Sequence, residues 1–276
     1  MRSHNIIVLL NRLVRMLNYP IIDLHTHLRD KVGFHTKLAE EAGVDTVVAM
    51  ANTKPCLDNI DEIKKYLKQK HYVKVLPVSA ITIGREGKKL VDVDAAKKYV
   101  VGFSDDGNTL ENLDLLAEIL KKNVLVILHS EPEAEMIKKY LDVLKRFGGR
   151  LHLQHVVSKR AVEIIRKAKN SGLKFNCETC PHYFTYPNEI EDKPVSPPLG
   201  NLKDIKAVRR GLADGTIDVI ASDYAPIPRP KATGFASFSS FVALSYGLVL
   251  NGTLTKQQLK EKLYLNPKKL IQANLF

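Results

Sequence analysis

The sequence predicts an α/β protein, a TIM (β/α)8 barrel, from three observations. Short β-branched segments alternate with longer amphipathic segments from residue 21 onward. Several short segments are apolar at every position, as parallel strands covered on both faces are. The chain has 276 residues, close to the roughly 250 that such a barrel needs. A doubly wound open sheet is the alternative, but the glycine-rich nucleotide-binding turn expected after its first strand is absent from the sequence.

Eight segments have the composition of strands, and helical patterns lie between most of them. The strand candidates are residues 21–25, 44–50, 73–79, 99–105, 124–129, 150–155, 173–178 and 217–222. The helical patterns cover 38–43, 59–70, 110–122, 133–149, 158–172 and 201–215. Gly43, Gly148, Gly172 and Gly215 each precede the next strand, where C-cap glycines end helices. We therefore expect one barrel over residues 21–276, preceded by an N-terminal extension, residues 1–20, with little packing of its own.

The composition excludes several classes of protein. The formal net charge is +12, but the lysines are mixed with acidic residues in helical stretches, which favours a solvated surface over nucleic-acid binding. No apolar run reaches the ~20 residues of a membrane span, and the apolar stretch at 6–10 is too short for a signal peptide. Three cysteines suit a reducing compartment. We expect a cytoplasmic protein that binds neither nucleic acid nor membranes.

The first strand candidate leads into two histidines, His25 and His27, spaced so that both rings point the same way. Such a pair is common and by itself indicates little. Further potential ligands, however, also fall at the ends of strand candidates: Asp105, Asp106, His129, His155 and Asp223. In a TIM barrel all these ends lie on one face, where the active sites of such enzymes are found. Each residue alone could be a capping or buried polar group, but together they predict a metal site.

Eight segments in order resemble the successive signatures of dihydroorotases, a family of metal-dependent barrels in the amidohydrolase superfamily. They are IIDLHTHLRD, MANTKP, GFSDDG, ILHSE, LHLQH, CPHYF, SPPL and GTIDVIASDYAP. The resemblance extends over about residues 21–275. It implies a hydrolase barrel of this type, here without the small β-sandwich that many relatives carry.

The resemblance also implies roles for individual residues. Zinc, as one or two ions, would be bound by His25, His27, His129 and His155, with Asp106 between two metal positions. Asp223 would be both a metal ligand and the catalytic proton shuttle. Arg29 and Asn52 would bind the carboxylate of an anionic substrate, dihydroorotate or carbamoyl-aspartate.

Parts of the substrate shell depart from the family pattern. Ile227 replaces a histidine that helps to hold the substrate carboxylate, and Ser196 replaces an asparagine. We therefore expect a dihydroorotase of pyrimidine biosynthesis with weakened activity. The alternatives are a hydantoinase-like or allantoinase-like ring amidase, or a dihydroorotase-like subunit assembled with aspartate transcarbamoylase. A homo-oligomer is equally compatible with the sequence.

The remaining motifs favour structural roles. The Cys177–Cys180 pair lacks the second pair of a structural zinc site and is interpreted as packing. His35, His71 and His152 are expected to be surface or structural residues, and His182 to lie next to the site without being a ligand.

Overall fold

The computed structural model describes residues 17–189, 195–226 and 238–272. Its named strands pair in parallel as two sheets, in the orders β1-β2-β3 and β4-β5-β6-β7. The strands are β1 (Ile22–Thr26), β2 (Thr46–Ala49), β3 (Lys74–Pro77), β4 (Leu125–Leu128), β5 (Arg150–Leu153), β6 (Asn176–Thr179) and β7 (Val219–Ile220).

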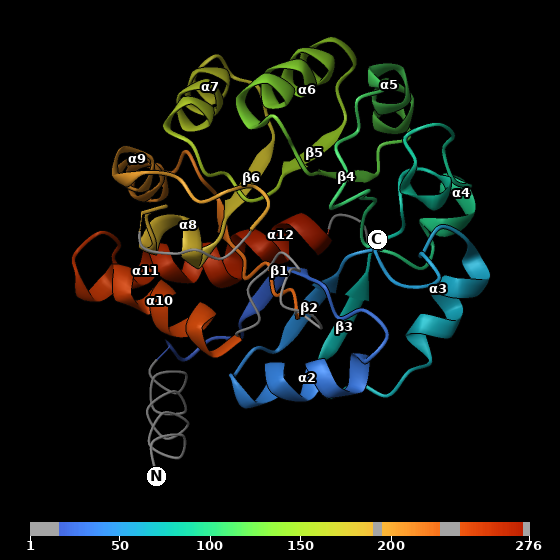
Figure 1. The fold of residues 1–276 in the computed structure, drawn as a ribbon, viewed down its shortest axis with the longest axis horizontal. Helices are drawn as coiled ribbons and strands as arrows, with labels where there is room; N and C mark the ends of the chain where they lie inside the picture. Colours follow the sequence, from blue (N-terminus) through green and yellow to red (C-terminus); the bar gives the residue numbers. More distant parts are fainter. Residues whose placement is uncertain (1–16, 190–194, 227–237, 273–276) are drawn as a thin grey trace.

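Isolated bridges join the two sheets at both seams. Phe103 bridges Ser79 beside β3 and Val126 in β4, and Thr26 in β1 bridges Tyr224 beyond β7. The strands therefore follow one another around a ring (Figure 1), and the predicted TIM barrel is confirmed.

One predicted strand is much shorter than expected. Residues 99–105 form only isolated bridges at Phe103, whose N–H donates to the Leu125 carbonyl and whose carbonyl accepts from the Ile127 N–H at 2.8 Å each. On the β3 side, the backbone from Val101 to Ser104 also hydrogen-bonds to Pro77 and Ser79. Beside Phe103, a Cβ on Gly102 would lie 3.0 Å from the Leu125 carbonyl oxygen. Beyond it, Asp105 binds the backbone after β3 and turns the chain out of the ladder.

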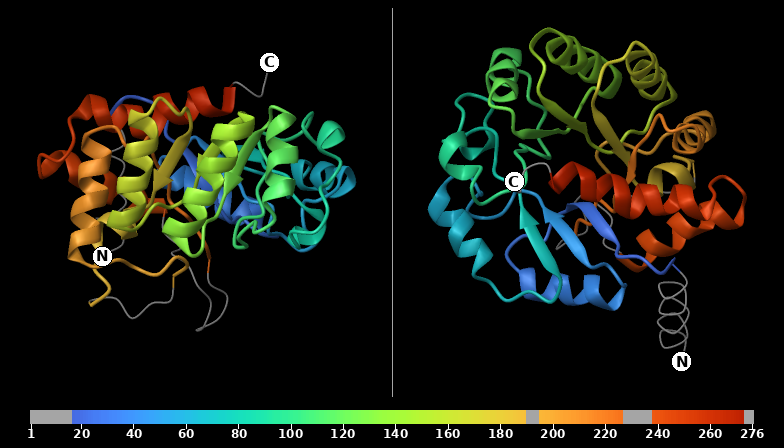
Figure 2. Two further views of the ribbon diagram at one scale, coloured as in Figure 1. Left: turned by 90° about the horizontal axis from the view of Figure 1, so that it is seen from above. Right: turned by 180° about the vertical axis from the view of Figure 1, so that it is seen from behind.

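Helices pack around the outside of the ring, except for the last one, which crosses one end of it (Figures 1 and 2). They are α2 (Val32–Glu41), α3 (Ile60–Leu67), α4 (Val93–Ala96), α5 (Leu113–Lys121), α6 (Glu133–Phe147), α7 (Lys159–Asn170), α8 (Pro181–Thr185), α9 (Leu202–Ala213), α10 (Phe238–Leu250), α11 (Lys256–Lys260) and α12 (Asn266–Gln272). Two short turns, η1 (Ile83–Arg85) and η2 (Glu261–Leu265), complete the order. The four predicted C-cap glycines all have positive φ, between 71° and 88°, a region that costs a residue with a Cβ free energy.

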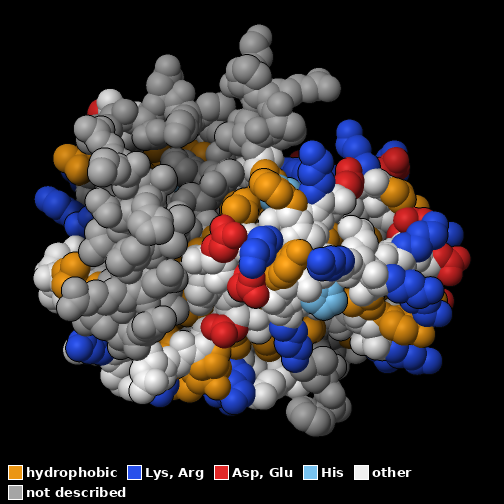
Figure 3. Space-filling model, turned by 90° about the horizontal axis from the view of Figure 1, so that it is seen from below, with side chains coloured by type: hydrophobic (Ala, Val, Ile, Leu, Met, Phe, Trp, Pro, Cys, Tyr) orange, Lys and Arg blue, Asp and Glu red, His pale blue; other side chains and the backbone are white. Residues whose placement is uncertain are grey.

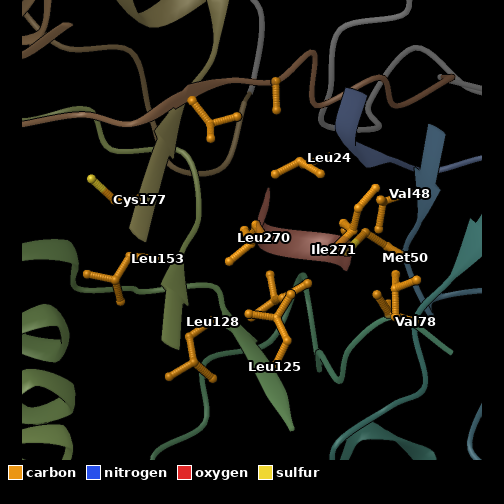
Figure 4. Close-up of a cluster of buried hydrophobic side chains, with 14 of the residues drawn as sticks. Leu24, Val48, Met50, Val78, Leu125, Leu128, Leu153, Cys177, Leu270 and Ile271 are labelled. Atoms are coloured by element: carbon orange, nitrogen blue, oxygen red, sulfur yellow. The ribbon is translucent and has the colours of Figure 1, made fainter. Parts of the chain in front are cut away.

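The last helix, α12, lies across the amino ends of the strands. Its Leu270 and Ile271 point into the ring of apolar side chains from the strands (Figure 4). The guanidinium of Arg150, the first residue of β5, donates to the Leu270 carbonyl at 2.7 Å. The amino end of the barrel is therefore closed by apolar packing, and the carboxyl end is left for a site.

The surface is mixed in charge. On the part of the face in Figure 3 that is coloured by side-chain type, lysine and arginine side chains alternate with acidic and apolar ones. This arrangement agrees with the solvated-surface interpretation of the net charge. Among the helices in the described ranges, none is both long enough and apolar enough to span a membrane.

Candidate metal centre

Six side chains predicted to bind metal converge at the carboxyl end of the barrel. They come from β1, from the segment after Phe103 and from the ends of β4, β5 and β7: His25, His27, Asp106, His129, His155 and Asp223. All six are buried. A cavity of about 340 Å³ opens above them. The lining residues are His27, Arg29, Asn52, Asp106, Gly107, His129, His155, Ser196, Asp223 and Ala225.

The first half of the site is formed by His25, near the end of β1, and His27, just after it. His25 Nε2 lies 3.4 Å from Asp106 Oδ1 and 3.4 Å from Asp223 Oδ1. His27 Nε2 lies 3.1 Å from Asp223 Oδ1 and 3.3 Å from Asp106 Oδ2. Both carboxylates thus face the same pair of ring nitrogens.

The second half is formed by the histidines after β4 and β5. His129 Nδ1 lies 2.9 Å from His155 Nε2, and these nitrogens lie 3.9 Å and 4.0 Å from Asp106 Oδ1. The six side chains thus fall into two groups of three, in each of which the potential ligand atoms lie within 4.8 Å of one another. Imidazole nitrogens with carboxylate oxygens are a donor set that Zn²⁺ and similar divalent ions prefer. These residues therefore fit one or two such ions.

Three of the histidines are oriented by a hydrogen bond on the ring nitrogen that faces away from the group. The acceptors are Glu178 for His25 Nδ1 (2.8 Å), Asn52 for His27 Nδ1 (3.0 Å) and Glu131 for His129 Nε2 (3.3 Å). A carboxylate or amide oxygen can only accept, so each ring must donate on that side. When such a ring is neutral, the opposite nitrogen has its lone pair toward the shared centre, as metal-binding histidines usually do.

The buried ionisable groups of the centre strongly shift one another's pKa values. Burial favours neutral Asp223, but nearby His25 and His27 outweigh it and lower the pKa of its carboxyl to about 2. Burial likewise opposes ionisation of Asp106, yet the histidines hold its pKa well below the usual value. Burial, with neighbouring His129, lowers the pKa of His155 to about 3. Both carboxylates are thus ionised and His155 is neutral near pH 7, the protonation states that metal ligands need.

Three residues of the site have a left-handed backbone. The φ angles are 51° at Arg29, 36° at His155 and 49° at Asp223. Non-glycine residues rarely adopt this region, and it is stable only where the surrounding structure enforces it. Such strain is typical of functional positions.

The predicted substrate-binding residues lie side by side at the cavity wall. Arg29 Nη1 lies 3.4 Å from the Asn52 carbonyl oxygen, and both side chains line the cavity. Ser196 lines it too, and its hydroxyl donates to Glu131 at 2.8 Å. Ile227 lies outside the described residues.

One potential ligand is directed elsewhere. Asp105 Oδ1 accepts from the backbone N–H groups of Ile81 (2.8 Å) and Thr82 (3.1 Å), and its Oδ2 from the Thr82 hydroxyl (2.5 Å). Of the two adjacent aspartates, Asp105 therefore anchors the loop after β3 and Asp106 faces the histidines.

Sequence reasoning missed the polar residues beneath the cavity. Glu178 contacts both His25 and His152, and the Gln154 amide nitrogen lies 3.2 Å from each ring nitrogen of His25. His152 is buried, as a structural residue would be. The available signal was Glu178 itself, an acidic residue inside an otherwise buried strand. Beside it, Cys177 and Cys180 are free and buried, and Cys180 lies close to His182 and Asp223.

Fold and site together define a barrel of the amidohydrolase type with two histidine–aspartate groups that could hold metal ions. Similar folds occur in an L-hydantoinase from Arthrobacter aurescens (TM-score 0.81, 19% identity, 91% of this chain and 70% of that one). They also occur in an inactive dihydroorotase-like domain of a CAD-like multifunctional protein from Chaetomium thermophilum (TM-score 0.73, 17% identity, 91% and 79%).

Sequence comparison is more specific than the fold. The dihydro-orotase-like family model matches residues 14–145. A dihydroorotase from Acetivibrio thermocellus is 33% identical over 92% of this chain and 73% of its own length. One from a Thermoanaerobacter species is 32% identical over 91% and 71%. The chain belongs to the dihydroorotase family.

Proposed function

We propose that this protein is a zinc-dependent dihydroorotase, which reversibly hydrolyses (S)-dihydroorotate to N-carbamoyl-L-aspartate in pyrimidine biosynthesis. The observation that carries the proposal is the convergence of four histidines and two aspartates beneath one cavity, in a chain of this family. A barrel retained only as a scaffold has no need for all six.

The cyclic amide bond of the substrate needs a strong nucleophile and a proton for its leaving nitrogen. Zinc, when bound by these ligands, lowers the pKa of water and polarises a carbonyl. Asp223 lies at the cavity wall with a pKa of about 2, so it is ionised and able to accept a proton near pH 7. We assign it as the general base and, once protonated, as the general acid toward the leaving nitrogen.

The substrate is an anion, and the cavity wall offers it matching groups. The Arg29 guanidinium supplies a planar pair of donors suited to a carboxylate. The Asn52 Oδ1 atom accepts a hydrogen bond from His27. The NH2 group of Asn52 is not used in this bond and can donate to a substrate carboxylate. We assign both residues to the substrate carboxylate.

The fold alone does not select this activity, because hydantoinases and an inactive dihydroorotase-like domain have similar folds. A ring amidase acting on hydantoin or allantoin is the second candidate, and replacement of the family's asparagine by Ser196 at the cavity favours it. An assembly with aspartate transcarbamoylase, or a homo-oligomer, stays a prediction from the family resemblance.

The decisive experiment combines elemental analysis of the purified chain with hydrolysis assays on dihydroorotate, hydantoin and allantoin. We expect one or two zinc ions per chain and turnover of dihydroorotate above that of the other two rings. Preference for hydantoin or allantoin would replace the substrate assignment. An active protein without metal would refute the zinc assignment.

A further inference from the structure

Glu178 is a buried acid in the interior of the barrel, below the cavity. Its strand, β6, pairs with β5 and β7, yet its side chain reaches His25 on β1, with which β6 is not paired. Such a contact requires the side chain to point across the barrel interior. Glu178 is fully buried, so solvent does not offset the cost of burying its charge.

Each carboxylate oxygen of Glu178 forms a hydrogen bond with a different histidine. Oε1 lies 2.8 Å from His25 Nδ1, and Oε2 lies 2.9 Å from His152 Nε2. An ionised carboxylate has no proton to give, so each imidazole is the donor. His152 therefore holds the second oxygen in place while the first faces His25.

The contact between Glu178 and His25 decides which nitrogen of the His25 ring carries the proton. The Gln154 amide nitrogen lies 3.2 Å from both ring nitrogens and offers a donor to either. With Glu178 as acceptor, the ring proton stays on Nδ1. When the ring is neutral, as a metal ligand must be, its lone pair is then on Nε2, which faces Asp106 and Asp223 at 3.4 Å. Without that acceptor, the lone pair can occupy either nitrogen.

We propose that Glu178 is a positioning residue of the metal centre, which keeps the His25 proton on Nδ1 and thereby raises the affinity of the centre for its metal. The proposal rests on the metal-binding part of the proposed function and is independent of the substrate. Acceptors next to ligating histidines commonly change metal affinity by about ten- to a hundredfold.

The test compares two variants of the full chain by competition with a chelator for Zn²⁺. Glu178→Met removes both acceptors at similar volume, and we expect about ten- to hundredfold weaker binding. Glu178→Gln can accept from one ring but must present its NH2 group to the other, so we expect an intermediate loss. Cys177→Ser, on the same strand, is the matched control and should bind zinc like the parent.

A purely structural role for Glu178 predicts a different result. The melting temperature of the metal-free variants would fall while their zinc affinity stayed at the parental value, and this outcome would overturn the proposal.

A second measurement covers the case in which the variants do not fold. Nitrogen-15 NMR of the histidine rings in the zinc-loaded parent should place the His25 proton on Nδ1, with His25→Gln used for assignment. Zinc on Nδ1 with the proton on Nε2 refutes the proposal. A parent that holds zinc but leaves dihydroorotate intact would instead contradict only the proposed substrate.

Discussion

Two hollows lie at opposite ends of the barrel, and the larger one is not the candidate site. The hollow at the amino ends measures about 620 Å³, compared with about 340 Å³ for the metal centre. In the larger hollow the charges are paired locally, with Lys169 2.5 Å from Asp218 and Arg150 bound to the Leu270 carbonyl. In the smaller cavity, two carboxylates are each shared among several imidazoles.

The difference shows that the pairing of polar groups identifies a site better than the size of a cavity. At the amino end, each named charge has a specific partner: Arg150 attaches α12 to β5, and Lys169 of α7 pairs with Asp218 next to β7. At the carboxyl end, ring nitrogens converge on the same oxygens and on one another, an arrangement that is stable only with a proton or a metal between them. Substitutions at the carboxyl end should therefore change activity, and substitutions at the amino end should change stability.

The largest effect is expected for His129→Ala. Removing this ring takes one ligand from the group that includes Asp106 and His155, so we expect zinc content to fall and dihydroorotate turnover to drop below detection. Elemental analysis and a steady-state assay measure both. His71→Ala, at an exposed histidine remote from the cavity, should retain both properties, and an active, metal-loaded His129→Ala would contradict the assignment.

Asp223→Asn should lose the proton shuttle and keep the fold. We expect kcat to fall by about 10²- to 10⁴-fold, with a melting temperature close to that of the parent. Asp218→Asn provides the comparison at the amino end, because Asp218 pairs with Lys169 and accepts from the Cys177 N–H at 2.8 Å. That variant should lower the melting temperature and leave kcat unchanged; the opposite pattern would reverse the roles of the two ends.

Arg29→Ala should reduce kcat/KM for dihydroorotate by more than tenfold, because the substrate carboxylate loses its full counter-charge. Zinc content should stay the same, since Arg29 is outside both ligand groups. Parental kcat/KM in this variant would count against dihydroorotate and in favour of a neutral ring as the substrate.

The smallest effect is expected at Lys262, which is buried and donates to the Ile217 carbonyl at 2.6 Å. Burial lowers the pKa of its amine. Between that lowered value and the ordinary value near 10.5, the unfolded chain binds more protons than the folded one, so stability rises with pH. A single group contributes at most about 1.4 kcal/mol per pH unit.

Lys262→Met should flatten this rise without changing turnover. Urea unfolding of the parent and the variant between pH 8 and 10.5 measures the difference. Equal slopes for the two proteins would show that Lys262 titrates alike in both states.

The sequence by itself determined the order of the elements and the identity of the potential ligands. Apolar β-branched runs, amphipathic helices and C-cap glycines are local signals, and they placed seven of the strands and five of the helices between them, with only the end of α2. Because parallel strands in a barrel end on one face, His25 and Asp223 could be assigned to one site although nearly the whole barrel separates them in the chain.

Only the tertiary structure decided which of these polar groups face one another. Asp105 and Asp106 are adjacent and chemically alike, and backbone direction after Phe103 sends one to the loop after β3 and the other to the histidines. Glu178 was not singled out in the sequence, and its contact with His25 on β1 exists only across the barrel interior. Side-chain contacts between unpaired strands depend on the stagger of the whole ring, which no local pattern of residues specifies.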